Sequence, residues 1–262
     1  MKKSETDKKN LFIHKRNELI RGSDKYSLLA KRAMNTIYFA LQKDNLYSYR
    51  FLTFKFITLK DFLGLQNNAD YISRIKDALM ELMETLELYN FEDPINKRQY
   101  KWFATRFLNE ARIEKQNNEW VAIIEVNQTI KDIMRLQGNF TQLDIVIFQN
   151  KIRTKYAMKL YEYLKSFNNY VYLELSMEQI KKVLGIEESR TYRYFGDLKR
   201  LIDRQIKEIA KKTDLKELKL VTDKKSKTFR FLINSQATNQ APTKQETKEK
   251  LNSLLQKAFV GF

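Results

Sequence analysis

The chain has 262 residues, of which 43% are hydrophobic and 31% charged, and its net charge is +17. This length suits about two globular domains of ~100 to 200 residues each, and the positive charge favours a partner that carries phosphates. The absence of cysteine excludes disulfides and cysteine metal sites. The spacing of the six glycines excludes the GxxxxGK and GxGxxG phosphate-binding loops.

The N-terminal sequence MKKSETDKKN is charged, so residues 1–10 are predicted to be disordered and no targeting segment is recognised. His14, the only histidine, is expected to be a solvated residue of this tail. No apolar run approaches the ~18 residues of a membrane span, so we expect a cytoplasmic protein without a membrane partner. We also expect no metal, no cofactor, no catalytic residue and no enzymatic activity.

In the first half of the chain, hydrophobic spacing predicts a helix over Tyr26–Gln42. Aromatic and β-branched residues predict a strand over Phe51–Ile57. Thr58 is expected to cap a short helix that Gly64 ends.

Polar residues at 67–70 predict the start of a longer helix, whose apolar stripe runs from Ile72 to Leu86. Two strand-like runs, Tyr100–Leu108 and Trp120–Val126, suit a long β-hairpin wing joined by a charged segment. A connecting helix is expected over Asn127–Leu136. The candidate contact residues around the start of the longer helix are Asn68, Tyr71, Arg74 and Lys76.

The second half repeats this order of elements. A helix is predicted over Lys151–Phe167 and a strand over Tyr170–Leu175. Ser176 and Gln179 form a capping box that starts a short helix ending at Gly185. A longer helix is expected from about Ser189, and a hairpin closes the domain.

Two basic features distinguish this second half, where residues 151–234 hold 21 lysines and arginines against 11 aspartates and glutamates. A row of cations along one line of a helix repels itself unless an anionic partner neutralises it. The row consists of Arg190, Arg193, Arg200, Arg204, Lys207 and Lys211. The tip of the hairpin adds Lys224, Lys225 and Lys227, as expected for a wing against a phosphate backbone.

The duplicated order predicts an α+β fold of two tandem winged-helix, or helix-turn-helix, domains with β-hairpin wings. Ala33 precedes Gly64 in the first copy as Ala157 precedes Gly185 in the second. The predicted domains are residues 11–138 and 139–234, followed by a linker and a short amphipathic helix over 235–262. Together with the basic helix and wing, this order favours nucleic-acid binding. Phe195, Trp102 and Trp120 are expected to pack in the core and wing, while Tyr192 and Tyr194 remain open candidates for base stacking.

The most specific motifs of the chain lie in the second domain. They are Arg153–Lys165, Leu184–Ile186 and Tyr192–Arg200, with Glu208–Ile209 and Thr213–Leu215 downstream. On these motifs the chain resembles the iteron-binding plasmid replication initiators of the theta-replication type, over roughly residues 10–234. Gly196 departs from the family pattern, since proline is often found there. Carried onto this chain, the resemblance places the residues that read DNA bases at Ser189, Arg190, Thr191, Tyr192, Arg193, Lys199 and Arg200.

The resemblance implies a main DNA reader in residues 139–234, and dimerisation with auxiliary DNA contacts in residues 11–138. It further implies binding to direct repeats of double-stranded DNA at a replication origin, with host replication proteins such as an initiator and a helicase as partners. A homodimer in equilibrium with the monomer would repress the initiator's own promoter. Two alternatives stay open: a winged-helix transcriptional repressor without initiator activity, and a metal-dependent nuclease or relaxase. The latter is disfavoured because Glu81, Glu84 and Glu87 are expected to form one solvated helix edge.

Overall fold

The computed structural model describes residues 12–66, 69–93, 95–135 and 139–234. The predicted disordered segment at 1–10, the linker and tail helix over 235–262, and the contact residue Asn68 lie outside the described residues. The chain forms two compact units that alternate along the sequence. Unit 1 takes the described residues within 1–16, 26–84 and 107–151, and unit 2 takes those within 17–25, 85–106 and 152–262.

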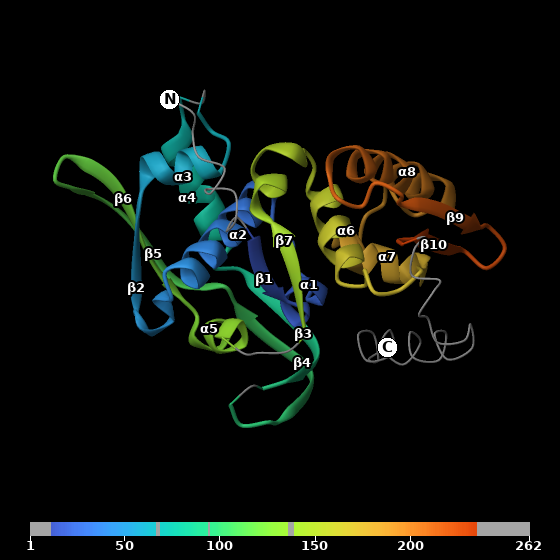
Figure 1. Ribbon diagram of the computed structural model, residues 1–262, viewed down its shortest axis with the longest axis horizontal. Coiled ribbons are helices and arrows are strands. Elements are labelled where there is room, and N and C mark those ends of the chain that lie inside the picture. Colours follow the sequence, from blue (N-terminus) through green and yellow to red (C-terminus); the bar gives the residue numbers. More distant parts are fainter. Residues whose placement is uncertain (1–11, 67–68, 94, 136–138, 235–262) are drawn as a thin grey trace, which may run out of the picture. The chain divides into compact units, whose positions relative to one another are not determined.

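Unit 1 is a winged helix whose three-stranded antiparallel sheet has the order β2-β6-β5. Ile37, Leu59 and Leu79 of its three helices are buried in the core beneath this sheet. The β5–β6 hairpin, green in Figure 1, extends beyond the helices of the unit. The winged-helix elements are α2 (Leu28–Lys43), β2 (Phe51–Lys55), α3 (Phe56–Phe62), α4 (Tyr71–Glu81), β5 (Leu108–Gln116) and β6 (Glu119–Val126). The unit also contains β1 (Phe12–Arg16), η2 (Leu46–Ser48), α5 (Gln128–Arg135), β7 (Phe140–Asp144), which pairs with β1, and η3 (Ile147–Lys151).

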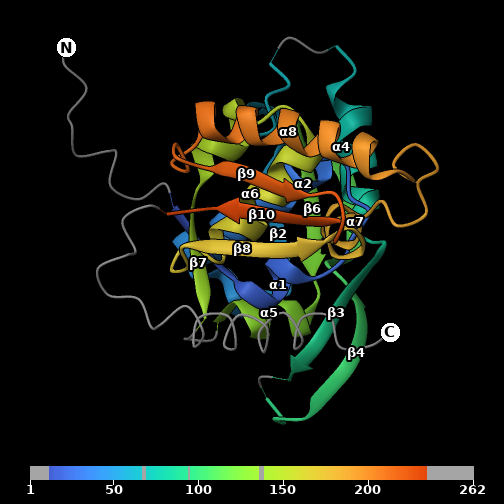
Figure 2. The ribbon, with the colours of Figure 1, turned by 90° about the vertical axis from the view of Figure 1, so that its right-hand side faces the viewer.

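Unit 2 repeats the same connectivity, with a sheet of order β8-β10-β9 (Figure 2). Leu160, Ile202 and Phe229, from its first helix, its long helix and the sheet, are fully buried. The winged-helix elements are α6 (Lys155–Lys165), β8 (Tyr172–Ser176), α7 (Met177–Leu184), α8 (Phe195–Lys212), β9 (Lys219–Asp223) and β10 (Thr228–Leu232). The unit also holds α1 (Asn17–Arg21) and the hairpin of β3 (Thr85–Glu92) and β4 (Gln99–Arg106). The predicted α+β fold with two winged-helix domains is therefore confirmed. The sequence places the boundary between the two domains at residues 138 and 139. Whether each of these segments folds by itself is not tested, so this boundary stays a prediction.

The first half differs from the sequence-based expectation in its strands. Helix α4 ends at Glu81, and Leu86 lies on β3, where Leu86 and Leu88 are buried with the two-residue period of a strand. The charged segment after residue 107 is itself the strand β5, so β6 pairs with β5, whereas residues 100–106 of the predicted run lie on β4 and pair with β3. The expected single wing is thus two hairpins, β3–β4 and β5–β6.

Three local expectations are also wrong. Thr58 lies inside α3, which begins at Phe56 without a side-chain cap. His14 is exposed, as expected of a solvated residue, but it lies on β1 and not in a tail, and its backbone exchanges hydrogen bonds of 3.0 and 2.8 Å with the Gln42 side chain. Trp102 and Trp120 lie on hairpin strands but are 56% and 43% exposed, so they do not pack as expected.

Candidate nucleic-acid interface

The helix-turn-helix of unit 2 is fixed at both ends of α7 by local chemistry. The Ser176 hydroxyl accepts a hydrogen bond of 3.2 Å from Gln179 N, and Gln179 Oε1 accepts one of 2.7 Å from Ser176 N, so the predicted capping box is confirmed. At the other end Gly185 has φ 65, a left-handed conformation that favours glycine. The turn therefore starts where the sequence predicts it.

The residues expected to open the second helix lie instead in a loop. Helix α8 begins at Phe195, and Ser189 is held in a turn by a bond of 3.0 Å from its N to Ile186 O. The stretch before Phe195 contains Thr191, Tyr192 and Tyr194, and β-branched and aromatic residues lose more side-chain freedom in a helix than Leu or Ala does. The Phe195 ring, 4.8 Å from the ring of buried Phe229, fixes the start of the helix.

This loop presents several of the predicted base readers to solvent. Arg190, Thr191 and Arg193 are exposed, so two guanidinium groups stand just before the helix N-terminus. Tyr192 is half-buried edge-on against Tyr156 at 6.4 Å, which makes it a packing residue in this conformation. Tyr194 is 68% exposed and is the better placed of the two tyrosines for stacking on a base.

On α8 itself, part of the predicted cation row is already paired. Lys199 Nζ lies 2.6 Å from Asp203 Oδ2, and Arg200 pairs with Asp197. Both ion pairs are partly exposed, so exchanging these carboxylates for phosphates costs little. Arg204 is exposed, and the structure records no ion pair for it among the described residues. Lys207 and Lys211 are exposed further along the helix.

The wing tip between β9 and β10 carries three exposed lysines around a fixed turn. Asp223 Oδ1 accepts a hydrogen bond of 2.8 Å from Lys225 N, and this bond, with that from the Ser226 side chain, lowers the pKa of Asp223. Lys227 adopts φ 54, and its carbonyl accepts a bond of 3.1 Å from Met177 N at the start of α7. Asp223, the one carboxylate of the tip, is therefore hydrogen-bonded within the turn, and the lysines of the tip are exposed to solvent. These are Lys224, Lys225 and Lys227.

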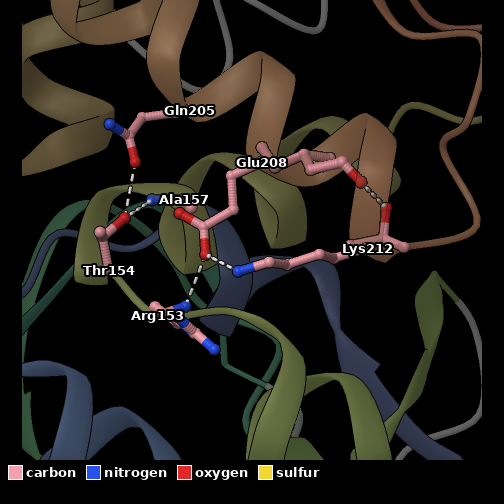
Figure 3. A network of polar contacts seen from close by, with 8 residues as sticks. Arg153, Thr154, Ala157, Gln205, Glu208 and Lys212 are labelled. Carbon is pink, nitrogen blue, oxygen red and sulfur yellow. Dashed lines mark hydrogen bonds and ion pairs between the residues drawn. The ribbon is translucent and has the colours of Figure 1, made fainter.

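A polar network holds α8 against the start of α6 (Figure 3). The Thr154 hydroxyl accepts a bond of 3.1 Å from Ala157 N, which caps α6, and donates one of 2.6 Å to Gln205 Oε1. Glu208 Oε1 accepts bonds of 2.7 Å from Arg153 N and 2.9 Å from Lys212 Nζ. The network therefore fixes the orientation of α8. The loop that precedes α8, residues 189–194, is called the reading loop below.

Unit 1 has a weaker counterpart at the start of α4. Arg74 and Lys76 are exposed, as expected for contact residues. Tyr71 is half-buried, and Lys60 Nζ lies 4.5 Å from its ring centre. The Tyr71 ring therefore packs against the Lys60 ammonium group. Burial lowers the pKa of Arg32, and the nearby charge of Arg74 adds to this effect. Together these residues form a cationic surface on the helix-turn-helix of unit 1.

Sequence reasoning missed other cations of the two units. Lys60 supports Tyr71, Lys155 lies 5.3 Å from the Tyr156 ring centre, and Lys182 lies 3.6 Å from the Tyr89 ring centre. Lys60 and Lys182 meet their rings only in space, so no spacing rule identifies them, whereas Lys155 directly precedes Tyr156 in the sequence. The basic run from Lys97 to Arg106 is visible in the sequence, where its pattern predicts only a wing strand.

The three carboxylates considered for a nuclease do not share one helix edge. Glu81 Oε2 accepts a bond of 2.5 Å from Ser27 N at the start of α2. Glu87 lies on β3 and accepts a hydrogen bond from the Tyr89 hydroxyl; burial, and then this bond, raise the pKa of that tyrosine. Within residues 12–66, 69–93, 95–135 and 139–234, no cluster of three or more His, Asp or Glu side chains could hold a metal ion. No helix in this part of the chain is long and apolar enough to span a membrane.

These features define a DNA-binding protein of the tandem winged-helix class. The family described as Initiator Replication protein, WH1, matches residues 12–165. The match covers more than half of the chain, which therefore belongs to this family of replication initiators, and the family resemblance seen in the sequence is confirmed. DNA binding at a replication origin belongs to that role.

A solved structure described as "Crystal structure of SeMet derivatives of domain2 and domain 3 of RctB" is similar to this chain. The TM-score is 0.47 at 12% sequence identity, and the match covers 78% of this chain and 80% of that chain. No protein with a curated description matches the sequence significantly.

Proposed function

We propose that this initiator binds directly repeated iterons at a plasmid origin as a monomer and represses its own promoter as a dimer. In this proposal both winged-helix units of one chain contact the same DNA, with unit 2 as the main reader. Host proteins, including an initiator and a helicase, open the duplex in the cytoplasm, and the protein itself has no catalytic activity. The observation that carries the proposal is the duplicated helix-turn-helix with cations left outward at the reading loop and the wing.

The mechanism requires no reacting group. Lysines of the wing tip, such as Lys224 and Lys225, neutralise phosphates and release counterions, which supplies affinity without reading sequence. Guanidinium groups of Arg190 and Arg193 are able to form bidentate hydrogen bonds to base edges in the major groove. Two reading helices can enter grooves about one helical turn apart, ~10 to 10.5 base pairs.

Substitutions at the loop and the wing separate these two roles. An arginine of the loop that contacts a base contributes to specific binding. Replacing such a residue, Arg190 or Arg193, with Ala is expected to weaken binding to the specific site by about 1–3 kcal/mol, roughly 5- to 150-fold. Lys224→Ala and Lys225→Ala are expected to weaken specific and random DNA equally. Lys216→Ala, at an exposed lysine between α8 and β9, is the matched control and should change neither. Equal losses on both DNAs from every loop variant would contradict the assignment of the reading loop.

Replication assays separate an initiator from a repressor that uses the same surfaces. A plasmid that carries the gene and its repeats should replicate at a copy number that falls with Arg193→Ala. A protein that binds the repeats and silences its promoter, but never sustains replication, would be the transcriptional repressor instead. Incubation with supercoiled plasmid and Mg²⁺ should produce no nicking, and sedimentation should show monomers and dimers that interconvert with concentration.

A further inference from the structure

The β3–β4 hairpin belongs to unit 2, although it lies in the sequence between α4 and β5 of the first winged helix. Its root is fixed beside the helix-turn-helix of unit 2. Ser23 and Glu87 exchange backbone hydrogen bonds of 2.8 and 2.9 Å, and Lys182 of α7 lies 3.6 Å from the Tyr89 ring centre. Glu187, in the turn after α7, interacts electrostatically with both Tyr89 and Lys182. Figure 2 shows the two strands extending away from α7, so the hairpin is an arm attached next to the turn that precedes the reading loop.

Aromatic packing and hydrogen bonds order the part of the arm near its apex. The rings of Phe91, Tyr100 and Phe103 pack together with centre separations of 5.2, 5.5 and 6.3 Å. At the apex, Asp93 Oδ1 accepts hydrogen bonds of 2.8 Å from Ile95 N and 3.0 Å from Asn96 N. These bonds hold the backbone of Ile95 and Asn96 against the Asp93 side chain.

The apex presents an apolar side chain to solvent, since Ile95 is 71% exposed. From Lys97 to Arg106 the chain has four cations and no carboxylate, and all four are exposed. The acids that precede this run are engaged: Asp93 orders the apex, and Glu92 Oε2 accepts a bond of 2.6 Å from the Gln99 side chain. Among the described residues the structure records no ion pair for these cations. They are Lys97, Arg98, Lys101 and Arg106.

We propose that the β3–β4 arm is a third DNA-contacting element, which places its cations on the phosphate backbone and Ile95 against a base step in the minor groove. This inference rests on the proposed function. A cationic strand suits phosphates, and an exposed apolar residue is the device that minor-groove proteins use to unstack a step and bend the duplex. The arm thereby bends DNA beside the sequence read by the loop and α8.

A second copy of the chain is the other partner that a free strand edge could take. Charge argues against it, because pairing two copies through β4 brings together two strands that each carry cations and no carboxylate. Duplex DNA neutralises the same cations, so DNA is the occupant that the charge favours.

The test measures DNA bending and salt dependence with the full chain. Ends of a duplex that carries the binding site are labelled for energy transfer, and the bend is compared between Ile95→Met and Ile95→Lys. The methionine keeps an apolar wedge and should keep the bend. The lysine adds a cation, so affinity should be unchanged or higher while the bend falls toward that of free DNA. A phosphate contact alone would leave the bend of Ile95→Lys unaltered and would overturn the wedge.

The cations of the arm are tested by the salt slope. The double variant Arg98→Ala/Lys101→Ala should reduce the slope of log K against log salt by about 1.8, or ~0.9 for each phosphate that the protein no longer neutralises. Lys216→Ala is the control for removal of a surface charge and should leave the slope unchanged. In a Trp120→Phe background Trp102 is the only tryptophan, and its emission should change when DNA binds.

The outcomes separate this inference from the proposed function. If the arm variants bind DNA as the wild type does, with the same bend and salt slope, and Trp102 emission does not change on binding, the arm does not contact DNA. This result would overturn the inference and leave the proposed function standing. Arm variants that shift sedimentation from dimer to monomer, with DNA binding intact, would make the hairpin a self-association surface and overturn the proposal. No binding of DNA by the wild type would overturn the proposed function, and the arm with it.

Discussion

Removing the buried charge of Lys159 should destabilise unit 2 strongly. Its Nζ lies 3.3 Å from Asp24 Oδ1 and also donates to the Asp24 carbonyl, with the side chains only 6% and 2% exposed. Lys159→Met keeps much of the side-chain length but leaves the Asp24 carboxylate without this cation in a buried site. Breaking a buried ion pair by removing one partner costs about 3–5 kcal/mol. The measurement is the free energy of unfolding from urea titration of the full chain.

Two comparisons show whether burial of the ion pair causes the expected loss of stability in Lys159→Met. Lys25 lies 3.9 Å from Glu188 with both side chains largely exposed, so Lys25→Met should cost only ~0–1 kcal/mol. The double variant Lys159→Met/Asp24→Leu should recover much of the stability, because an apolar pair of similar volume often replaces a buried ion pair without cost. Equal effects of Lys159→Met and Lys25→Met would refute the reasoning.

Three further variants test the packing of unit 2. Thr154→Ala removes the cap of α6 and a partner of Gln205, and should lower the free energy of unfolding by about 1–2 kcal/mol in urea titration. Gly185→Ala should cost at least ~1 kcal/mol in the same assay, since φ is 65 and the new Cβ would lie 2.9 Å from Lys159 Nζ. Burial raises the pKa of Tyr163, so its folded-state pKa lies above the unfolded value of about 10. The stabilisation is complete below about pH 10 and is lost as pH rises further, and unfolding measured from pH 8 to 11 should show a smaller alkaline loss in Tyr163→Phe.

Local signals in the sequence are sufficient for most helices. The capping box at Ser176 and the left-handed Gly185 act within three or four residues, so they are visible in the sequence and present in the structure. The predicted cations Arg190 and Arg193 are likewise exposed. What the sequence predicts well is therefore what neighbouring residues determine.

The errors come from contacts between residues distant in the chain. Strand β5 is rich in Glu, Lys and Arg, which are depleted in strands, and its pairing with β6 outweighs that preference. The start of α8 depends on packing of Phe195 against Phe229, 34 positions later in the chain. The sequence pattern consequently predicts a helix where the structure has the reading loop, although it identifies the exposed residues of that loop.

The alternation of the two units along the chain also limits what a fragment can do. Residues 139–234 contain a complete winged helix but lack the segment 17–25, which supplies Asp24 to Lys159. They also lack Arg21, whose guanidinium lies 4.1 Å from the Phe167 ring centre and donates a bond of 3.0 Å to Ser166 O. We therefore expect this fragment to unfold at lower urea than unit 2 does in the full chain. Addition of a peptide spanning residues 17–25 should raise the midpoint with the logarithm of the free peptide concentration once this exceeds the dissociation constant. A fragment as stable as the intact unit, with or without the peptide, would show that residues 17–25 contribute nothing to the stability of the second winged helix.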